Sequence, residues 1–266
     1  VKLSLREPRL QTSAPVVEQQ SFKAVLNTLW RQHAFRHIVM AFCVSYFFAM
    51  GVFVWMPTFF MRSHGMETGE LGAWLAFAWG VCGLFSTYLG GFLASRYAVG
   101  KETLQMRAVA FVFIFAGLLS VMVYLSSGKY SAIGFMVAYG IVTNLAAGPI
   151  FSAIQSLVND RMRSVALAII FLFSNLIGFG LGPLAAGVLS DLLAPMFGQE
   201  SLRYALVMFS PGYMWVAYFY WKASNTIEAD IRRVELGIGS TEDETAKSTL
   251  NAQNRNVENI VDFSNP

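Results

Sequence analysis

Charged residues are scarce in this sequence. Asp, Glu, Lys and Arg make up 13% of the 266 residues, whereas about a quarter of a typical soluble domain is charged. Hydrophobic residues make up 55%. This composition excludes an ordinary soluble domain. The net charge of +3 is small, and no basic run alternates with aromatic residues, so nothing indicates a nucleic-acid partner.

Cysteine and histidine are equally rare. Cys43 and Cys82 both fall within apolar stretches, so neither a disulfide nor a metal site is expected. The three histidines, His33, His37 and His64, are too scattered for a metal centre. The sequence shows no nucleophile next to a base within an apolar stretch, no paired carboxylates and no phosphate-binding loop. We therefore expect no enzymatic activity, no metal and no cofactor.

The chain instead contains six apolar stretches of roughly 18–27 residues without a charged side chain. Each is long enough to cross the hydrocarbon core of a bilayer, about 30 Å, as a helix. We predict an all-α membrane protein whose six transmembrane helices form one bundle. The stretches are Ile38–Met61, Leu71–Phe92, Ala108–Ser126, Ala132–Val158, Val165–Leu189 and Tyr204–Trp221.

Lys and Arg are distributed unevenly between the two sides of the predicted bundle. Sixteen of the 19 fall in segments on one side, and only Arg62, Lys129 and Arg203 fall on the other. Positive charge is retained in the cytoplasm. We expect a multi-pass protein of the inner (plasma) membrane with both termini in the cytoplasm.

Four regions follow from these patterns. The chain begins at Val1 and not at Met, so we expect the true beginning to lie upstream. Residues 21–35 have the pattern of an amphipathic helix on the cytoplasmic surface, although an extension of the first span would give a similar pattern. A short helix over 223–236 is also compatible with the sequence. The regions are 1–20, a flexible cytoplasmic linker; 21–35, the amphipathic helix; 36–222, the transmembrane bundle; and 223–266, a polar cytoplasmic tail, largely disordered.

Small residues recur every three or four positions in the second, fourth and fifth stretches, where they allow helices to approach closely. Glycine next to proline also suits helices that bend. We expect the first, second, fourth and fifth spans to pack tightly or line a path, and the third and sixth to face lipid. The candidate packing and hinge residues are Gly83, Gly148, Pro149, Gly178, Gly182 and Pro183.

Polar and amphipathic side chains within the bilayer require a reason. Five such residues lie on faces that could converge on one central cavity: Tyr46, Trp79, Asn144, Gln155 and Asn175. We expect all but Gln155, which is near the cytoplasmic end, to bind substrate. The alternative for the asparagines and Gln155 is a hydrogen bond to a neighbouring helix, and for the two aromatic residues ordinary packing. No acid or base lies inside a span, so a proton-coupling residue, if there is one, lies elsewhere.

Other aromatic residues lie near the ends of spans. Tyr218, Tyr220 and Trp221 precede Lys222, and Trp55 lies near the outer end of the first span. We interpret them as residues that anchor the helices at the membrane interfaces.

The segment from Gly90 to Lys101, which ends the second span, is similar to a known signature loop. It matches the pattern Gly-x-Leu-Ala-Asp-Arg-x-Gly-Arg-Lys of the major facilitator superfamily at Gly91, Leu93, Ala94 and Arg96. Ser95 replaces the aspartate, which puts a charge latch by this loop in doubt. The chain therefore resembles the C-terminal six-helix half of such a transporter.

Further strings resemble those of bacterial spinster-like members of that superfamily, among them Ser63–Met66, Gly69–Gly72, Arg161–Arg163, Asn175–Gly178 and Ser201–Leu206. The resemblance implies a twelve-helix secondary transporter that works by alternating access. It implies three partners: a small organic solute, with an amphipathic or lipid-like molecule as one option, the lipid bilayer, and a missing N-terminal six-helix half.

Two alternatives remain open at the level of sequence. The chain could be a six-span scaffold or assembly protein that transports nothing, or a half-size transporter that forms a dimer. The lack of buried charge is compatible with the first alternative, whereas the glycine–proline pairs favour a moving transporter.

Overall fold

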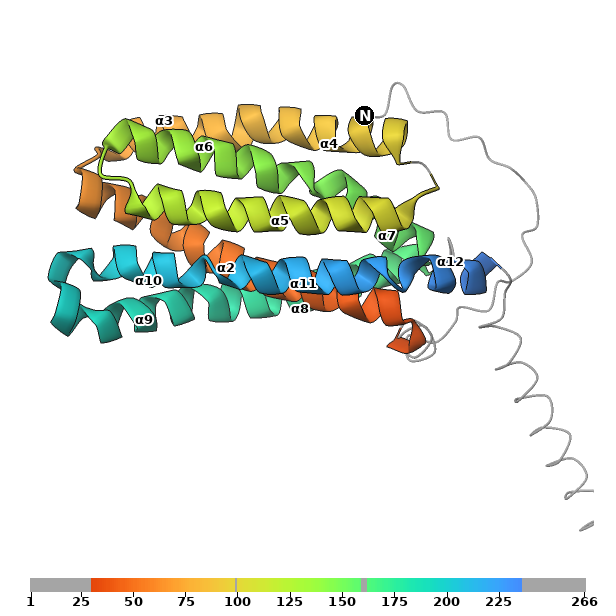
Figure 1. The fold of residues 1–266 in the computed structure, drawn as a ribbon. Helices are drawn as coiled ribbons and strands as arrows, with labels where there is room; N and C mark the ends of the chain where they lie inside the picture. Colours follow the sequence, from red (N-terminus) through yellow and green to blue (C-terminus); the bar gives the residue numbers. More distant parts are fainter. Residues whose placement is uncertain (1–29, 99, 159–161, 236–266) are drawn as a thin grey trace, which may run out of the picture.

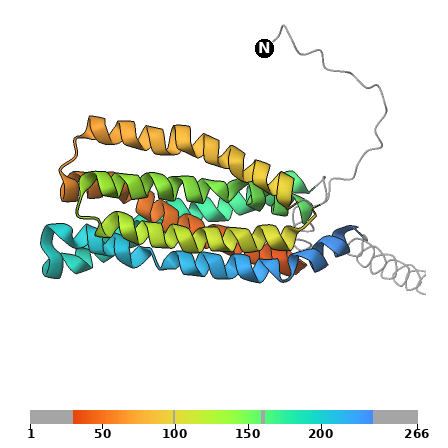
Figure 2. The same ribbon diagram turned by 45° about the horizontal axis from the view of Figure 1, so that its top comes forward.

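The computed structural model describes residues 30–98, 100–158 and 162–235. Its helices lie side by side and form one bundle, as Figures 1 and 2 show. We call the end with α12 the α12 end, and the end where α2 turns into α3 the Gly65 end. The helices are α2 (His33–His64), α3 (Thr68–Leu75), η1 (Ala76–Cys82), α4 (Gly83–Tyr97), α5 (Glu102–Leu125), α6 (Lys129–Leu145), α7 (Ala147–Ser156), α8 (Arg163–Asn175), η2 (Leu176–Leu181), α9 (Gly182–Phe197), η3 (Gly198–Glu200), α10 (Ser201–Phe209), α11 (Gly212–Ser224) and α12 (Ile227–Glu235).

Five continuous helical stretches of the described chain are long and apolar enough to cross a membrane. The last of them, Arg163–Ser224, has 62 residues and reverses direction near Gly198, whose φ is +56°. Helices α9 and α10, on either side of this reversal, lie side by side in Figure 1. The bundle therefore has six crossings, and the predicted all-α membrane fold is confirmed.

The first crossing begins earlier than the sequence indicated. Helix α2 starts at His33, and Ala34 and Phe35 are completely buried in the core. Residues 33–35, which we assigned to the amphipathic helix, therefore belong to the first transmembrane helix. The remainder of that predicted helix before residue 30, and the linker 1–20, lie outside the described residues.

Proline marks three irregularities in the crossings. The fourth crossing breaks at Ala146, three residues before Pro149, and the sixth turns at Pro211 between α10 and α11. Pro183 follows η2 at the start of α9. Proline has no backbone N–H and its ring hinders the preceding turn, so regular α-helical bonding is lost at these positions.

Two crossings contain a π-helical segment near the middle of their length. The second contains η1 (Ala76–Cys82), and the fifth contains η2 (Leu176–Leu181). A π segment inserts an additional residue into a turn, which shifts the faces of the helix beyond it, and such segments are frequent at functional sites. Neither segment was predicted from the sequence.

The third and sixth crossings do not only face lipid, contrary to our expectation. In α5, 50% of the most apolar stretch of 18 residues is buried inside the bundle, compared with 22% of the corresponding stretch in the crossing Thr68–Tyr97. Helices α5 and α11 pack against each other, and Phe113, Tyr213 and Tyr220 stack between them. Large side chains can fill a helix contact as well as small ones, so the lack of a small-residue stripe was a poor indicator of lipid exposure.

Small residues lie where other crossings approach closely. A Cβ on Gly148 would be 2.8 Å from the Cα of Gly91, and a Cβ on Gly178 would be 2.8 Å from the Cβ of Tyr46. Gly182 lies against the backbone of α2. Gly83 differs, because a Cβ there would meet Asn144 at 3.7 Å, an ordinary contact distance. Gly83 is therefore not required for close packing.

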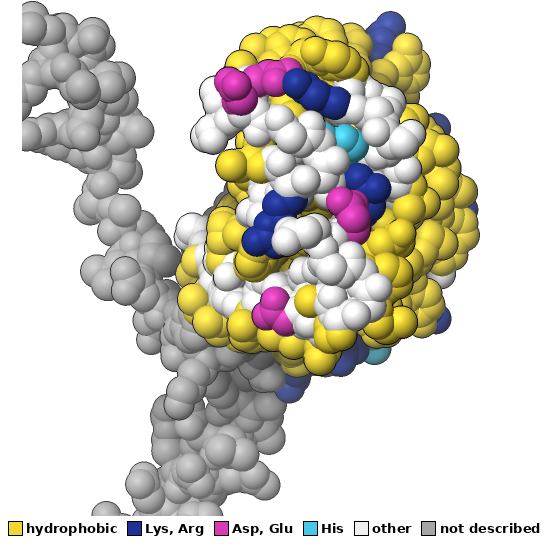
Figure 3. Space-filling view, turned by 90° about the vertical axis from the view of Figure 1, so that its left-hand side faces the viewer, with side chains coloured by type: hydrophobic (Ala, Val, Ile, Leu, Met, Phe, Trp, Pro, Cys, Tyr) yellow, Lys and Arg dark blue, Asp and Glu magenta, His cyan; other side chains and the backbone are white. Residues whose placement is uncertain are grey.

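The Gly65 end carries a mixture of charges, which Figure 3 shows face on. Glu70 pairs with Lys129 at 2.6 Å, and Glu200 lies 2.8 Å from the Nε of Arg203. That Nε is buried without a hydrogen bond of good geometry, so the second contact is an ion pair only. Ser63 also donates to Glu200, at 3.3 Å.

At the α12 end, part of the predicted polar tail is an ordered helix. Asp230 of α12 is 1% exposed, and its carboxylate accepts a hydrogen bond of 2.7 Å from the backbone N–H of Ala34. Helix α12 thereby caps the first turn of α2, where backbone donors have no partner within the helix. Arg96 lies in the last turn of α4 and is exposed. The tail after Glu235 lies outside the described residues.

Candidate functional site

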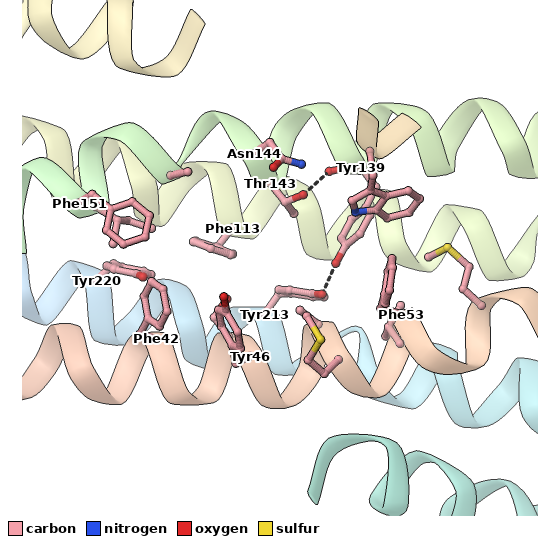
Figure 4. Close-up of a pocket in the computed structure, with 18 residues that line it drawn as sticks. Phe42, Tyr46, Phe53, Phe113, Tyr139, Thr143, Asn144, Phe151, Tyr213 and Tyr220 are labelled. Atoms are coloured by element: carbon pink, nitrogen blue, oxygen red, sulfur yellow. Dashed lines mark hydrogen bonds between the residues drawn. The ribbon is translucent and has the colours of Figure 1, made fainter. Parts of the chain in front are cut away.

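A cavity of about 250 Å³ lies within the bundle, between α2, η1, α5, α6, α7 and α11. Figure 4 shows the side chains around it. None of them is an Asp, Glu, Lys, Arg or His, and nine carry an aromatic ring. The lining residues are Phe42, Ser45, Tyr46, Ala49, Met50, Val52, Phe53, Met56, Trp79, Phe113, Tyr139, Thr143, Asn144, Ala147, Ile150, Phe151, Tyr213 and Tyr220.

The polar groups of helix α6 in this cavity are held in place by hydrogen bonds. The hydroxyls of Tyr139 and Tyr213 are bonded to each other, and Thr143 donates to the carbonyl oxygen of Tyr139 at 2.9 Å, as Figure 4 shows. The side chain of Asn144 donates to the carbonyl oxygen of Gly140 at 2.8 Å. Since that bond uses only the amide nitrogen, the Oδ1 of Asn144 remains available as an acceptor.

Aromatic rings shape the two ends of the cavity. Phe42, Phe151 and Tyr220 gather at one end of the view in Figure 4, and Phe53 lies at the other. Phe42 stacks on Tyr46 with ring centroids 5.0 Å apart, and Phe53 packs edge-on against Trp79 at 5.4 Å. The cavity therefore offers flat apolar surfaces with a few hydroxyl and amide groups.

Three of the four predicted substrate-binding residues line this cavity. Tyr46 comes from α2, Trp79 from η1 and Asn144 from α6. Thus, side chains from the first, second and fourth crossings are brought together, as the sequence indicated. Trp79 lies inside the π-helical segment.

Asn175, the fourth predicted residue, does not line the cavity. It is exposed, and its side chain donates to the carbonyl oxygen of Phe171 at 2.7 Å. The prediction placed Asn175 on the same face as Gly178 and Gly182 by assuming a regular helix. Segment η2 begins at the next residue, and one inserted residue turns the following faces by about 100°, so Asn175 and Gly182 point in different directions.

Sequence reasoning missed most of the aromatic residues from α5, α6 and α11. Tyr220 was assigned to the membrane interface, but it is completely buried, whereas its neighbours Tyr218 and Trp221 are exposed. Tyr213 and Tyr220 are seven residues apart and therefore share one face of α11. This seven-residue spacing was the feature of the sequence that could have placed both tyrosines in the cavity. Trp55, also assigned to the interface, is half-buried and donates to the carbonyl oxygen of Pro183.

In the described part of the chain, six helical crossings surround an apolar cavity, which is the architecture of an α-helical membrane protein. The model of the Major Facilitator Superfamily matches residues 1–183. The chain therefore belongs to the Major Facilitator Superfamily, a family of membrane transporters.

A relative and two solved structures show which members it is similar to. The chain is 32% identical over 177 residues to an "MFS-type efflux pump" of Mycolicibacterium smegmatis (strain ATCC 700084 / mc(2)155), which covers 66% of this chain and 41% of that protein. A bacterial homolog of the human lysosomal transporter Spinster has a similar fold. Its inward-facing, unoccupied structure gives a TM-score of 0.70 at 19% identity, over 83% of this chain and 53% of that one. The inward-facing, occupied structure gives a TM-score of 0.64 at 22% identity, over 76% of this chain and 51% of that one.

The chain spans about half the length or less of these proteins. The predicted resemblance to a spinster-like member of the superfamily is confirmed at the level of the fold.

Proposed function

We propose that this chain is the C-terminal half of a secondary active transporter. The transporter moves an organic solute across the inner membrane by alternating access, and an amphipathic or lipid-like solute is one candidate. The observation that carries the proposal is the uncharged cavity lined by Tyr46, Trp79 and Asn144, which come from three different crossings. Ligand sites in helix bundles are built in this way, from side chains of facing helices around a largely apolar hollow.

The irregular helices support a moving structure. Segment η1 contributes Trp79 to the cavity. Segment η2 ends at Leu181, directly before Gly182 and Pro183 of α9, which both contact α2. Interrupted helices next to a cavity are typical of transporters, because a broken helix can bend without losing the rest of its hydrogen bonds. We infer that the second and fifth crossings bend at these segments when the cavity changes its access.

The distribution of charge supports the orientation. Arg62, Lys129 and Arg203 belong to elements at the Gly65 end, whereas Arg96 and Lys222 lie at the α12 end. By the positive-inside rule the α12 end faces the cytoplasm, as do both termini. Residues 1–32 and the tail 223–266 are then cytoplasmic, and the partner of the bundle is an N-terminal six-helix half.

A matched pair of substitutions tests the cavity. Asn144 and Asn175 each donate to the carbonyl oxygen four residues earlier, but only Asn144 lines the cavity. In the complete protein, Asn144→Ala, Tyr46→Ala and Trp79→Ala should each reduce the transport of fluorescent organic dyes, whereas Asn175→Ala should not. Expression and membrane insertion are measured for each variant. Wild-type transport in all three cavity variants would reject the assignment.

The assignment as a half can be tested separately by the intact mass of the native gene product. A mass of roughly twice 29.4 kDa is expected for two equal halves in one polypeptide. A native mass near 29.4 kDa would instead favour the dimer or the scaffold.

A further inference from the structure

Tyr220 is a buried tyrosine of α11 whose hydroxyl has no hydrogen-bond partner among the described residues. The side chain is 0% exposed, and it lines the cavity. The other two cavity phenols on α6 and α11, Tyr139 and Tyr213, satisfy each other. A hydroxyl that is buried without a partner is destabilising, so a polar group that enters the cavity and bonds to it would be stabilised there.

The ring of Tyr220 is held firmly, so its hydroxyl has a fixed position. It stacks on Phe113 with centroids 5.4 Å apart and an angle of 9° between the planes. In Figure 4 it lies beside Phe42 and Phe151, at one end of the site. A solute that enters this end meets flat ring surfaces and then one phenol group that can donate or accept.

The lining that this chain contributes indicates the charge of the solute. None of its residues is an Asp, Glu, Lys, Arg or His, so this part of the site offers an anion no cationic partner to replace its hydration. Aromatic faces attract cations, but a full positive charge would find no carboxylate of this chain in the lining to balance it. The volume of about 250 Å³ is near the lower limit of small-molecule sites, about 300 Å³, which suits a solute of a few rings.

We propose that the cavity takes an uncharged solute with a flat aromatic body, and that Tyr220 selects it by a hydrogen bond to a polar group at one end of that body. The inference rests on the proposed transport function and specifies the class of its substrate. It assigns a specificity role to a residue of the sixth crossing.

Equilibrium binding to the complete transporter in lipid nanodiscs tests this inference without a transport assay. Four probes share one two-ring body: 2-naphthol, 2-methylnaphthalene, 2-naphthoate and 2-naphthyltrimethylammonium. Empty nanodiscs correct for partition into lipid. We expect 2-naphthol to bind most tightly, and the two charged probes to bind at least about tenfold more weakly.

The substitution Tyr220→Phe removes only the hydroxyl. It should weaken 2-naphthol binding about three- to tenfold, the range for one hydrogen bond, and leave 2-methylnaphthalene unchanged. Tyr218→Phe is the matched control, because Tyr218 lies on the same helix but is 52% exposed. A thermal unfolding midpoint near that of wild type shows that each variant is folded.

Each outcome decides the matter. The inference is overturned if Tyr220→Phe leaves the preference for 2-naphthol over 2-methylnaphthalene unchanged, if a charged probe binds as well as 2-naphthol, or if no probe binds. If the binding pattern is as expected but the complete protein moves no solute, the site is correct and the transport function is not. The two hypotheses can therefore fail separately.

Discussion

The indole N–H of Trp55 in α2 donates a hydrogen bond of 2.8 Å to the carbonyl oxygen of Pro183 in α9. Pro183 lies two residues after the end of the irregular segment η2. The ring of Trp55 also packs near Gly187, one turn further along α9. One side chain thus joins the long first helix to the fifth crossing beside its π-helical segment.

We expect Trp55→Phe to lower the stability of the bundle, because the interhelical bond is lost while an aromatic ring, smaller than the indole, remains. Such bonds in membrane proteins contribute about 0.6 kcal/mol on average and at most about 1.7 kcal/mol. The thermal unfolding midpoint in detergent measures the change. Trp215→Phe is the control, since Trp215 is 66% exposed. An equal effect of both substitutions would contradict a specific role of the bond.

The glycines of the fifth crossing provide a second prediction. A Cβ on Gly182 would collide with the carbonyl oxygen of Phe47, whereas Gly180 has open space around it. Gly182→Ala should therefore push α9 away from α2 and destabilise the protein by about 1–3 kcal/mol. Gly180→Ala should be nearly neutral. Thermal unfolding of the two variants gives the comparison, and a tolerated Gly182→Ala would disprove the close contact.

The third prediction concerns the cap of α2 by α12. Asp230→Ala should cost about 1 kcal/mol, because the N–H of Ala34 loses its acceptor in the first turn of α2. Asp230→Asn keeps an acceptor and should cost less. Glu228→Ala, on the exposed side of the same helix, is the control. Hydrogen exchange at the start of α2 should increase in Asp230→Ala only, and unchanged exchange there would argue against the cap.

The sequence predicted the number of crossings well, because a bilayer imposes strong constraints. Backbone groups must be satisfied within helices and charges must stay outside, so apolar length alone reveals each crossing. The same logic of helix faces placed Tyr46 and Asn144 in one cavity, since α2 and α6 are regular up to those positions. Trp79 lies within η1 and still lines the cavity.

The remaining differences have local physical causes. Asn175 was misplaced because the insertion in η2 depends on how the backbone bonds shift, and no residue type encodes that shift uniquely. Tyr220 and Trp55 were misassigned because an aromatic residue near a helix end suits both an interface and a core. Only the packing of α11 on α5, and of α2 on α9, decides between them.

The bonded hydroxyls of Tyr139 and Tyr213 lead to the last prediction. This pair links α6 to α11 inside the cavity, and both rings are buried. Tyr139→Phe and Tyr213→Phe should each be destabilising, because either substitution leaves the other hydroxyl without its partner. The double variant should lose less than the sum, with a coupling of about 1 kcal/mol, since it removes both polar groups together. The unfolding midpoints of wild type, the two single variants and the double variant complete the double-mutant cycle. Strictly additive losses would mean that the two hydroxyls do not depend on each other.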